Sequence, residues 1–240
     1  TPCPFSMESI LLPNKIKFNR GERPNEGILT VEPCTQGYGT TIGNALRRVL
    51  LSSLSGAAIT SVKIKNADHE FSVIKNVKED VLEIILNLKA VRVKLFSQEP
   101  VKLTLTVKGE KIVTAGDFAK DAQVEVVNPD LQLATLTDPS ATLEMEVTIT
   151  PGRGYRSTEE RSKEKAELGT IAIDAFFSPV LNVSYKVEAA RVGDKIDFDK
   201  LTLRVETDGS LDPLDAVNQA VTILQDNFQV AQRLMKILVQ

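Results

Sequence analysis

The segment that follows Gly209 carries a long, regular apolar repeat, and this repeat limits what the chain can fold into. Asp212 suits the N-cap of a helix, Pro213 its first position and Asp215 its first turn. The apolar residues behind this start are spaced alternately three and four positions apart: Leu214, Val217, Val221, Leu224, Phe228, Ala231, Met235 and Leu238. More than three heptads in a row predict one amphipathic helix, and at about 1.5 Å per residue it is near 40 Å long.

A helix of that length exceeds the diameter of a small domain, so part of it has to project or meet another chain. Burial of each apolar side chain of the repeat contributes about 1.5–3 kcal/mol, and half of them on each of two chains rival an association cost of about 4–15 kcal/mol. We therefore expect a homodimer that forms through this helix. The alternative is that the repeat packs on the chain's own sheet, and packing within the chain at its start is compatible with packing between chains at its end.

Two further helices are predicted from apolar stripes of helical spacing. The first follows a loop that contains Pro33, Gly37 and Gly39; Thr40 or Thr41 is expected to cap its start and Gly56 to end it. Its stripe consists of Ile42, Ala45, Leu46, Val49 and Leu50. The second stripe consists of Val77, Val81, Ile84, Ile85 and Leu88.

Alternation of apolar and polar residues predicts strands in the rest of the chain, at 27–31, 58–64, 91–95, 101–107, 143–149, 183–187 and 201–205. The polar segment 156–165 is predicted to be an exposed loop. Helices and sheets that occupy separate stretches of the chain indicate the α+β class, and 240 residues allow one or two domains, of which two is the better prediction.

The composition excludes several classes of protein. The chain has 32 acidic against 29 basic residues and a net charge of −3, so no overall field attracts nucleic acid or anionic lipid. Cys3 and Cys34 form no metal or disulfide framework, and no run of 18 apolar residues predicts a membrane span. Residues 1–6 lack the features of a secretion signal, and Met7 is a candidate natural start. We expect a cytoplasmic protein.

The glycines between the first strand and the first helix resemble a dinucleotide-binding turn only superficially. Gly43 comes four positions after Gly39, whereas the fingerprint needs a spacing of three, and no acid follows about twenty residues later. The simpler interpretation is that Gly37, Gly39 and Gly43 permit tight turning and close packing of the helix. We predict no cofactor.

Candidate catalytic and metal-binding groups are few. His69 is the one histidine and lies between Asp68 and Glu70, but a ligand set needs more donors, so a structural or interface role is favoured. Asp197 and Asp199 resemble a paired-acid magnesium site without a third carboxylate, and a turn before the strand is the preferred interpretation. With no phosphate loop, nucleophile elbow or zinc-helix motif, we predict no metal and no catalytic residues.

Several runs, in order, resemble the amino-terminal region of the bacterial RNA polymerase α subunit. They are Gly39–Ser53 (GTTIGNALRRVLLSS), His69–Ser72, Glu79–Lys89, Gly152–Tyr155, Val187–Val192, Asp199–Leu201 and Thr207–Gly209. The resemblance implies a dimerisation domain, 7–55 and 179–240, that is interrupted by an inserted sheet-rich domain, 56–178. The family dimerises through the first and last helices of the split domain, and the implied interface residues are Ile42, Leu46, Val49, Leu50, Val217, Val221, Leu224, Phe228, Ala231 and Met235.

The resemblance also implies partners. One copy of the α subunit holds the β subunit and the other holds β′, so that the dimer is a non-catalytic scaffold for DNA-templated transcription and meets DNA only through the complex. By position, Arg48 and Leu51 correspond to β-contacting residues, and Lys89, Ile173 and the region of Arg191 to β′-contacting residues. Family members usually continue into a DNA-binding domain; since the sequence stops at Gln240, we expect that this domain is either missing or was cut away. The alternatives are a homodimeric binding module of another pathway and an enzyme with an unrecognised site.

Overall fold

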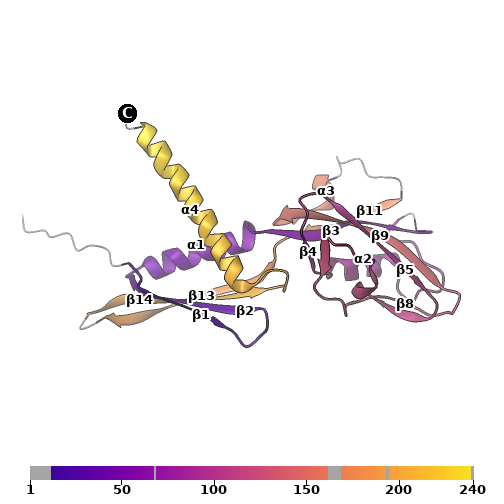
Figure 1. Cartoon of the computed structure of the whole chain (residues 1–240), viewed down its shortest axis with the longest axis horizontal. Helices are drawn as coiled ribbons and strands as arrows, with labels where there is room; N and C mark the ends of the chain where they lie inside the picture. The colour runs from indigo at the N-terminus through magenta and orange to yellow at the C-terminus, as the bar shows by residue number, and fades with distance from the viewer. Residues whose placement is uncertain (1–11, 68, 162–168, 193–194, 239–240) are drawn as a thin grey trace, which may run out of the picture. The chain divides into compact units, whose positions relative to one another are not determined.

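The computed structural model describes residues 12–67, 69–161, 169–192 and 195–238, which combine helices with antiparallel sheets (Figure 1). The α+β prediction is therefore confirmed. The chain divides into two compact units. The first consists of the residues up to Leu51, Val180–Thr207 and the residues from Asp212 onward, and the second consists of Ser52–Pro179 and Asp208–Leu211.

The first unit is built on a four-stranded antiparallel sheet in the order β1-β2-β14-β13. The strands are β1 Lys15–Arg20, β2 Glu26–Thr35, β13 Val180–Val192 and β14 Lys195–Thr207. Alternate residues of the two central strands are buried, and Val31 pairs with Leu201 and Leu29 with Leu203. Alternation of apolar and polar residues thus predicted these strands but not their ends. Strand β2 continues through Pro33, where a loop was predicted, and that prediction is wrong. Asp197 and Asp199 lie inside β14, so the predicted turn before this strand is also wrong.

Helix α1, Tyr38–Ser52, starts earlier than predicted because a distant carboxylate caps it. The backbone N–H groups of Gly37 and Gly39 donate to Oδ2 of Asp199, with N–O distances of 2.8 and 3.3 Å. An acid at this end satisfies orphan donors and interacts favourably with the helix dipole. The predictions that Thr40 or Thr41 caps the helix and that Gly56 ends it are wrong; Gly56 lies in the next strand.

Two glycines let α1 lie close against the sheet. A Cβ atom at Gly43 would lie 2.7 Å from Cδ2 of Tyr185 and 2.9 Å from Cδ1 of Leu201. A Cβ atom at Gly39 would lie 3.0 Å from Cγ1 of Val187. Such distances are too short for any side chain larger than hydrogen, so the packing interpretation of these glycines is confirmed.

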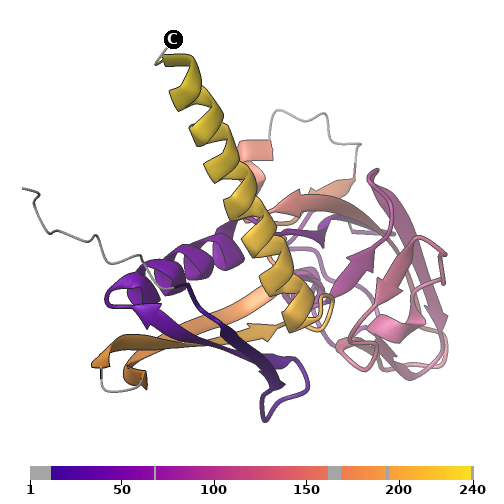
Figure 2. The ribbon, with the colours of Figure 1, turned by 60° about the vertical axis from the view of Figure 1, so that its left-hand side comes forward.

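Helix α4, Pro213–Leu238, is the predicted long helix, and its cap is also confirmed. Oδ1 of Asp212 accepts a hydrogen bond from the N–H of Leu214 at 2.9 Å. The first turns pack within the chain, because Pro213, Ala216, Val217 and Ala220 are buried. From Gln225 to Met235 every side chain is exposed, and Figure 2 shows this half of α4 leading away from the strands of its own unit.

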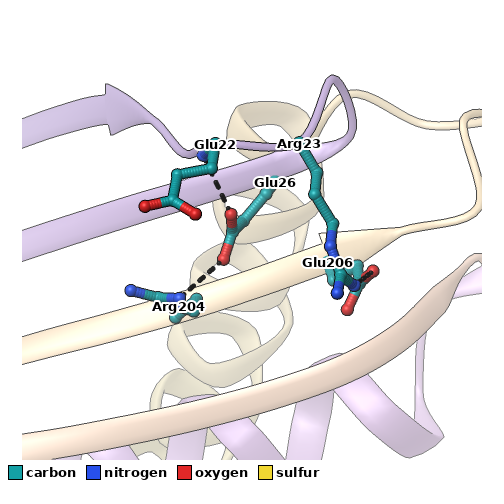
Figure 3. Close-up of polar contacts among 5 residues, drawn as sticks. All are labelled: Glu22, Arg23, Glu26, Arg204 and Glu206. Atoms are coloured by element: carbon teal, nitrogen blue, oxygen red, sulfur yellow. Dashed lines mark hydrogen bonds and ion pairs between the residues drawn. The ribbon is translucent and has the colours of Figure 1, made fainter.

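A cluster of charged side chains fixes the turn between β1 and β2 to β14 (Figure 3). The largely buried carboxylate of Glu26 accepts from the N–H of Glu22 at 3.0 Å and pairs with Nη1 of Arg204 at 3.1 Å. Glu26 lies directly opposite Glu206 in the sheet, and Arg23 pairs with Glu206 at 2.5 Å. Two arginines therefore compensate two carboxylates that would otherwise repel each other.

The second unit holds a sheet in the order β11-β3-β9-β5 with three two-stranded pairs, β4-β7, β6-β8 and β10-β12. Sequence alternation predicted its longer strands and missed most of the short ones. Its elements are β3 Ser55–Ile64, α2 Val81–Lys89, β4 Val93–Leu95, β5 Val101–Lys108, β6 Lys111–Thr114, η1 Ala115–Asp117, β7 Val124–Val126, β8 Gln132–Leu136, β9 Thr142–Arg153, β10 Tyr155–Arg156, α3 Thr158–Arg161, β11 Thr170–Ala172 and β12 Ala175–Phe176.

Helix α2 buries the predicted stripe from Val81 onward in the core of this unit. Val77 precedes the helix, whose N-cap is Asp80: its Oδ1 accepts from the N–H of Glu83 at 2.7 Å. In the segment predicted to be a loop, residues 158–161 form the short helix α3, and residues 162–165 lie outside the described residues.

Candidate protein–protein interfaces

The second half of α4 carries an apolar face that its own chain does not cover. Val217 is buried against its own unit, and Leu224, two turns later, is half-buried. Beyond it, Phe228 is 69% exposed and Met235 66% exposed, and Ala231 is exposed between them. The first part of the heptad repeat therefore packs within the chain, and its second part lies on an exposed surface.

Sequence reasoning missed two members of this face. Val230 is 53% exposed and Leu234 57% exposed, and both lie one helical row away from the three-four seam. The face is thus wider than a heptad seam. Ile223, which is half-buried, lies seven residues before Val230, and Leu234 lies four residues after it. This helical spacing of apolar residues was the signal that could have found them. We refer to Phe228, Val230, Ala231, Leu234 and Met235 as the α4 face.

The predicted interface residues of α1 differ in burial: two are buried and two are half-buried. Leu46 and Leu50 are buried within their own chain, so their side chains leave little surface for the predicted contact with a second copy. The reason is that they share a helical row with Gly39 and Gly43, which pack on the sheet. Ile42 and Val49 lie on a neighbouring row and are half-buried, and Val221 on α4 is exposed.

The predicted β-contacting residues lie away from the sheet-packed row of α1. Arg48 and Leu51 are exposed, as is the neighbouring Arg47, whose direction from the helix axis differs by about 100°. An arginine beside an exposed leucine offers a planar set of donors and an apolar contact, a combination that suits protein recognition.

The predicted β′-contacting residues fall into different environments. Nζ of Lys89 donates to Oδ2 of Asp174 at 3.0 Å, and Oδ1 of Asp174 accepts from the N–H of Thr158 at 2.9 Å. Ile173 is only 1% exposed and is buried in the core of the second unit next to Asp174, so its side chain leaves almost no surface for the predicted contact. Arg191 is exposed on β13.

These contacts perturb one carboxyl group of the site. The Thr158 N–H, and after it the ammonium group of Lys89, lower the pKa of Asp174 below its ordinary value of 3.8 because both stabilise the charged form. Asp174 thereby joins the end of α2 to the start of α3.

The candidate chemical groups named from sequence are not brought together. His69 is exposed, with Nδ1 3.3 Å from Oγ of Ser72, and its neighbour Asp68 lies outside the described residues. Cys34 is buried, and its pKa is raised by burial and by the charge of Asp199, whose carboxylate caps α1; Cys3 lies outside the described residues.

Within the described ranges, no group of three histidine, cysteine or acidic residues could hold a metal ion. In the same ranges no helix is both long and apolar enough to span a membrane.

Comparison with known proteins gives two matches. Residues 62–178 match the family of the RNA polymerase Rpb3/RpoA insert domain, and this match falls inside the second unit. The DNA-directed RNA polymerase subunit alpha of Alkaliphilus oremlandii (strain OhILAs) is 49% identical over 204 residues. The chain is thus similar to the RNA polymerase α subunit over most of its length. The alignment covers 85% of this chain and 64% of that relative, so the chain spans just under two thirds of the relative's length.

These two matches confirm the resemblance drawn from the sequence motifs. Of the positions that the resemblance assigned to partners, the structure exposes Arg48, Leu51 and Arg191, leaves Lys89 partly exposed in an ion pair, and buries Ile173.

We predict that replacement of Asp174 by asparagine lowers the free energy of unfolding at pH 7 by about 0.5–1 kcal/mol, since the ion pair with Lys89 is partly exposed. The folded-state pKa of Asp174 is depressed, so its contribution is present above the unfolded value of 3.8 and is lost as the pH falls through the folded value. Urea unfolding at pH 7, 5 and 3.5 should show the deficit of Asp174→Asn shrinking only at the lowest pH.

The matched control is Asp130→Asn, which removes an exposed carboxylate of the same unit. It should leave stability within about 0.5 kcal/mol of the parent chain. A deficit of Asp174→Asn that does not depend on pH would contradict the electrostatic origin.

Proposed function

We propose that the chain is a non-catalytic assembly scaffold of a DNA-directed RNA polymerase. It forms a homodimer, and the dimer binds the β and β′ subunits for DNA-templated transcription in the cytoplasm. The exposed α4 face is the observation that carries the proposal, together with the similarity of the chain to the RNA polymerase α subunit.

A second copy of the chain is the occupant that best matches the α4 face. Four large side chains that are 53–69% exposed leave an apolar surface that is unusual on a monomer. A two-fold symmetric contact brings the same face of each copy together. Burial of these four side chains contributes about 1–2 kcal/mol for each of them, or roughly 8–16 kcal/mol over both copies. This gain is comparable with the cost of association, about 4–15 kcal/mol.

The two compact units suit the two roles. We assign dimerisation to the split unit, which carries α1 and α4, and the inserted position to the sheet-rich unit. Ile42, Val49 and Val221 extend the dimer interface around the α4 face, because all three retain accessible surface.

The large subunits bind through polar and mixed surfaces. Arg48 and Leu51 on α1 contact β, whereas Lys89, with Asp174 beside it, and Arg191 contact β′. Both copies carry both sets of residues, so the geometry of the dimer decides which set meets which subunit.

Replacement of Phe228 by aspartate should weaken the dimer at least about 100-fold, since the change places a charge in the centre of the apolar contact of each copy. Sedimentation equilibrium over a range of concentrations measures the dissociation constant. Gln229→Asp is the matched control, because it adds the same charge to the next residue, which points about 100° away around the helix.

The control should keep the dissociation constant of the parent chain within about threefold. Equal dissociation constants for Phe228→Asp and the parent chain would exclude the α4 face from the dimer. Circular dichroism of both variants distinguishes a lost contact from a lost helix.

Replacement of Arg48 by alanine should weaken capture of separately purified β subunit about 10- to 100-fold while the chain stays dimeric, because the change removes an exposed set of planar donors from the proposed contact. Arg47→Ala is the control: it removes an exposed arginine from the adjacent helical position. Titration of each dimer with labelled β subunit measures the affinity.

Failure of the unaltered dimer to capture β would overturn the scaffold proposal itself. Normal capture by Arg48→Ala would overturn only the assignment of this residue.

A further inference from the structure

The second unit has a groove of about 640 Å³ to which neither the motifs nor the proposed subunit contacts assign a role. It forms where β4 passes the start of β3 and the end of β9, three strands that Figure 1 labels. Residues from five segments of this one unit line it, including Lys94, Phe96, Arg153, Arg156 and Leu211. Its volume lies in the range of sites for small ligands and short peptides.

All charged side chains that line the groove are cationic: Lys94, Arg153 and Arg156. All three are exposed, and within the described residues the structure shows no ion pair for any of them. The chain as a whole has a net charge of −3, whereas the charge around this groove is positive. Such a rim attracts an anionic partner and repels a cationic one.

The rest of the lining is largely apolar. Val93 and Pro179 are buried, and Leu95 and Leu211 are half-buried, so each presents carbon atoms to the groove. Phe96 is 61% exposed, and Nζ of Lys94 lies 5.4 Å from the centre of its ring. The groove therefore combines an apolar lining with cations.

We propose that this groove binds an extended acidic segment of a partner protein, whose carboxylates pair with Arg153, Arg156 and Lys94 and whose apolar side chains contact the lining. Single-stranded nucleic acid suits the site less well. Proteins that bind it rely on aromatic rings that are free to stack on bases. Here a cation–π contact with Lys94 occupies a face of the Phe96 ring. The apolar lining also has more to contact in a peptide than in a phosphate backbone.

The probe for this proposal is a fluorescein-labelled eight-residue peptide of alternating aspartate and leucine, titrated with the full chain and followed by fluorescence anisotropy. Two matched peptides separate the contributions: one replaces aspartate by asparagine, and the other replaces leucine by serine. Each should bind at least about tenfold more weakly than the probe, because the groove recognises charge and apolar surface together.

The decisive variant is the pair Arg153→Gln and Arg156→Gln, which should weaken binding of the probe at least about tenfold, with Lys94→Gln as an independent single variant. Lys108→Gln is the control: it removes a cation of the same unit at the opposite end of β9, where Lys108 pairs with Thr142. It should bind the probe like the parent chain. Unchanged thermal unfolding shows that each variant is folded, and Lys94→Gln alone decides the test if the double variant is not.

Four results would overturn the proposal: no binding of the probe, equal binding of the serine peptide, equal loss in Lys108→Gln, or tighter binding of an eight-nucleotide oligothymidylate than of the probe. The first rejects the site, the next two reduce it to unspecific charge attraction, and the last reassigns it to nucleic acid. None of these results bears on the scaffold proposal, because no residue assigned to the dimer or to β and β′ lines the groove.

Discussion

The apolar face of the sheet β1-β2-β14-β13 has to be covered, and the rest of the first unit follows from how two helices cover it. Helix α1 comes close because Gly39 and Gly43 leave room for Val187, Tyr185 and Leu201. Helix α4 adds its first turns, where small residues such as Ala216 and Ala220 are fully buried. Helix α4 is 26 residues long and extends beyond the part that packs on the sheet. Its apolar face continues there, exposed in its own chain.

This arrangement connects stability with the proposed assembly. The residues that pack a helix on its own sheet are buried, and their neighbours on adjacent helical rows are the ones that the proposed contacts use. On α1, Leu50 is buried and Arg48 is exposed. In the second unit, Ile173 is buried and its neighbour Asp174 is half-buried. A scaffold of this kind acts through rigidly presented surfaces, so its buried residues matter for function chiefly by fixing where the exposed ones lie.

Local patterns predicted the parts of the structure that local chemistry decides. The heptad and the Asp212 cap gave α4, and alternation gave the long strands. The start of α1 was wrong because its cap, Asp199, lies about 160 residues away in sequence. Periodicity also cannot tell which apolar residues pack on the chain itself, so the sequence did not separate the buried Leu46, Leu50 and Val217 from the exposed residues of the same helices. The cationic groove was missed because five separate segments of the chain form it.

The most direct test of the central claim is the mass of the unaltered chain in solution, measured by light scattering at concentrations from 1 to 50 µM. If a second copy covers the α4 face, the mass is twice the 26.3 kDa of one chain, about 53 kDa, over this whole range. A mass of one chain throughout would mean that the exposed end of α4 does not bring two copies together, and would contradict the account of how this helix is used.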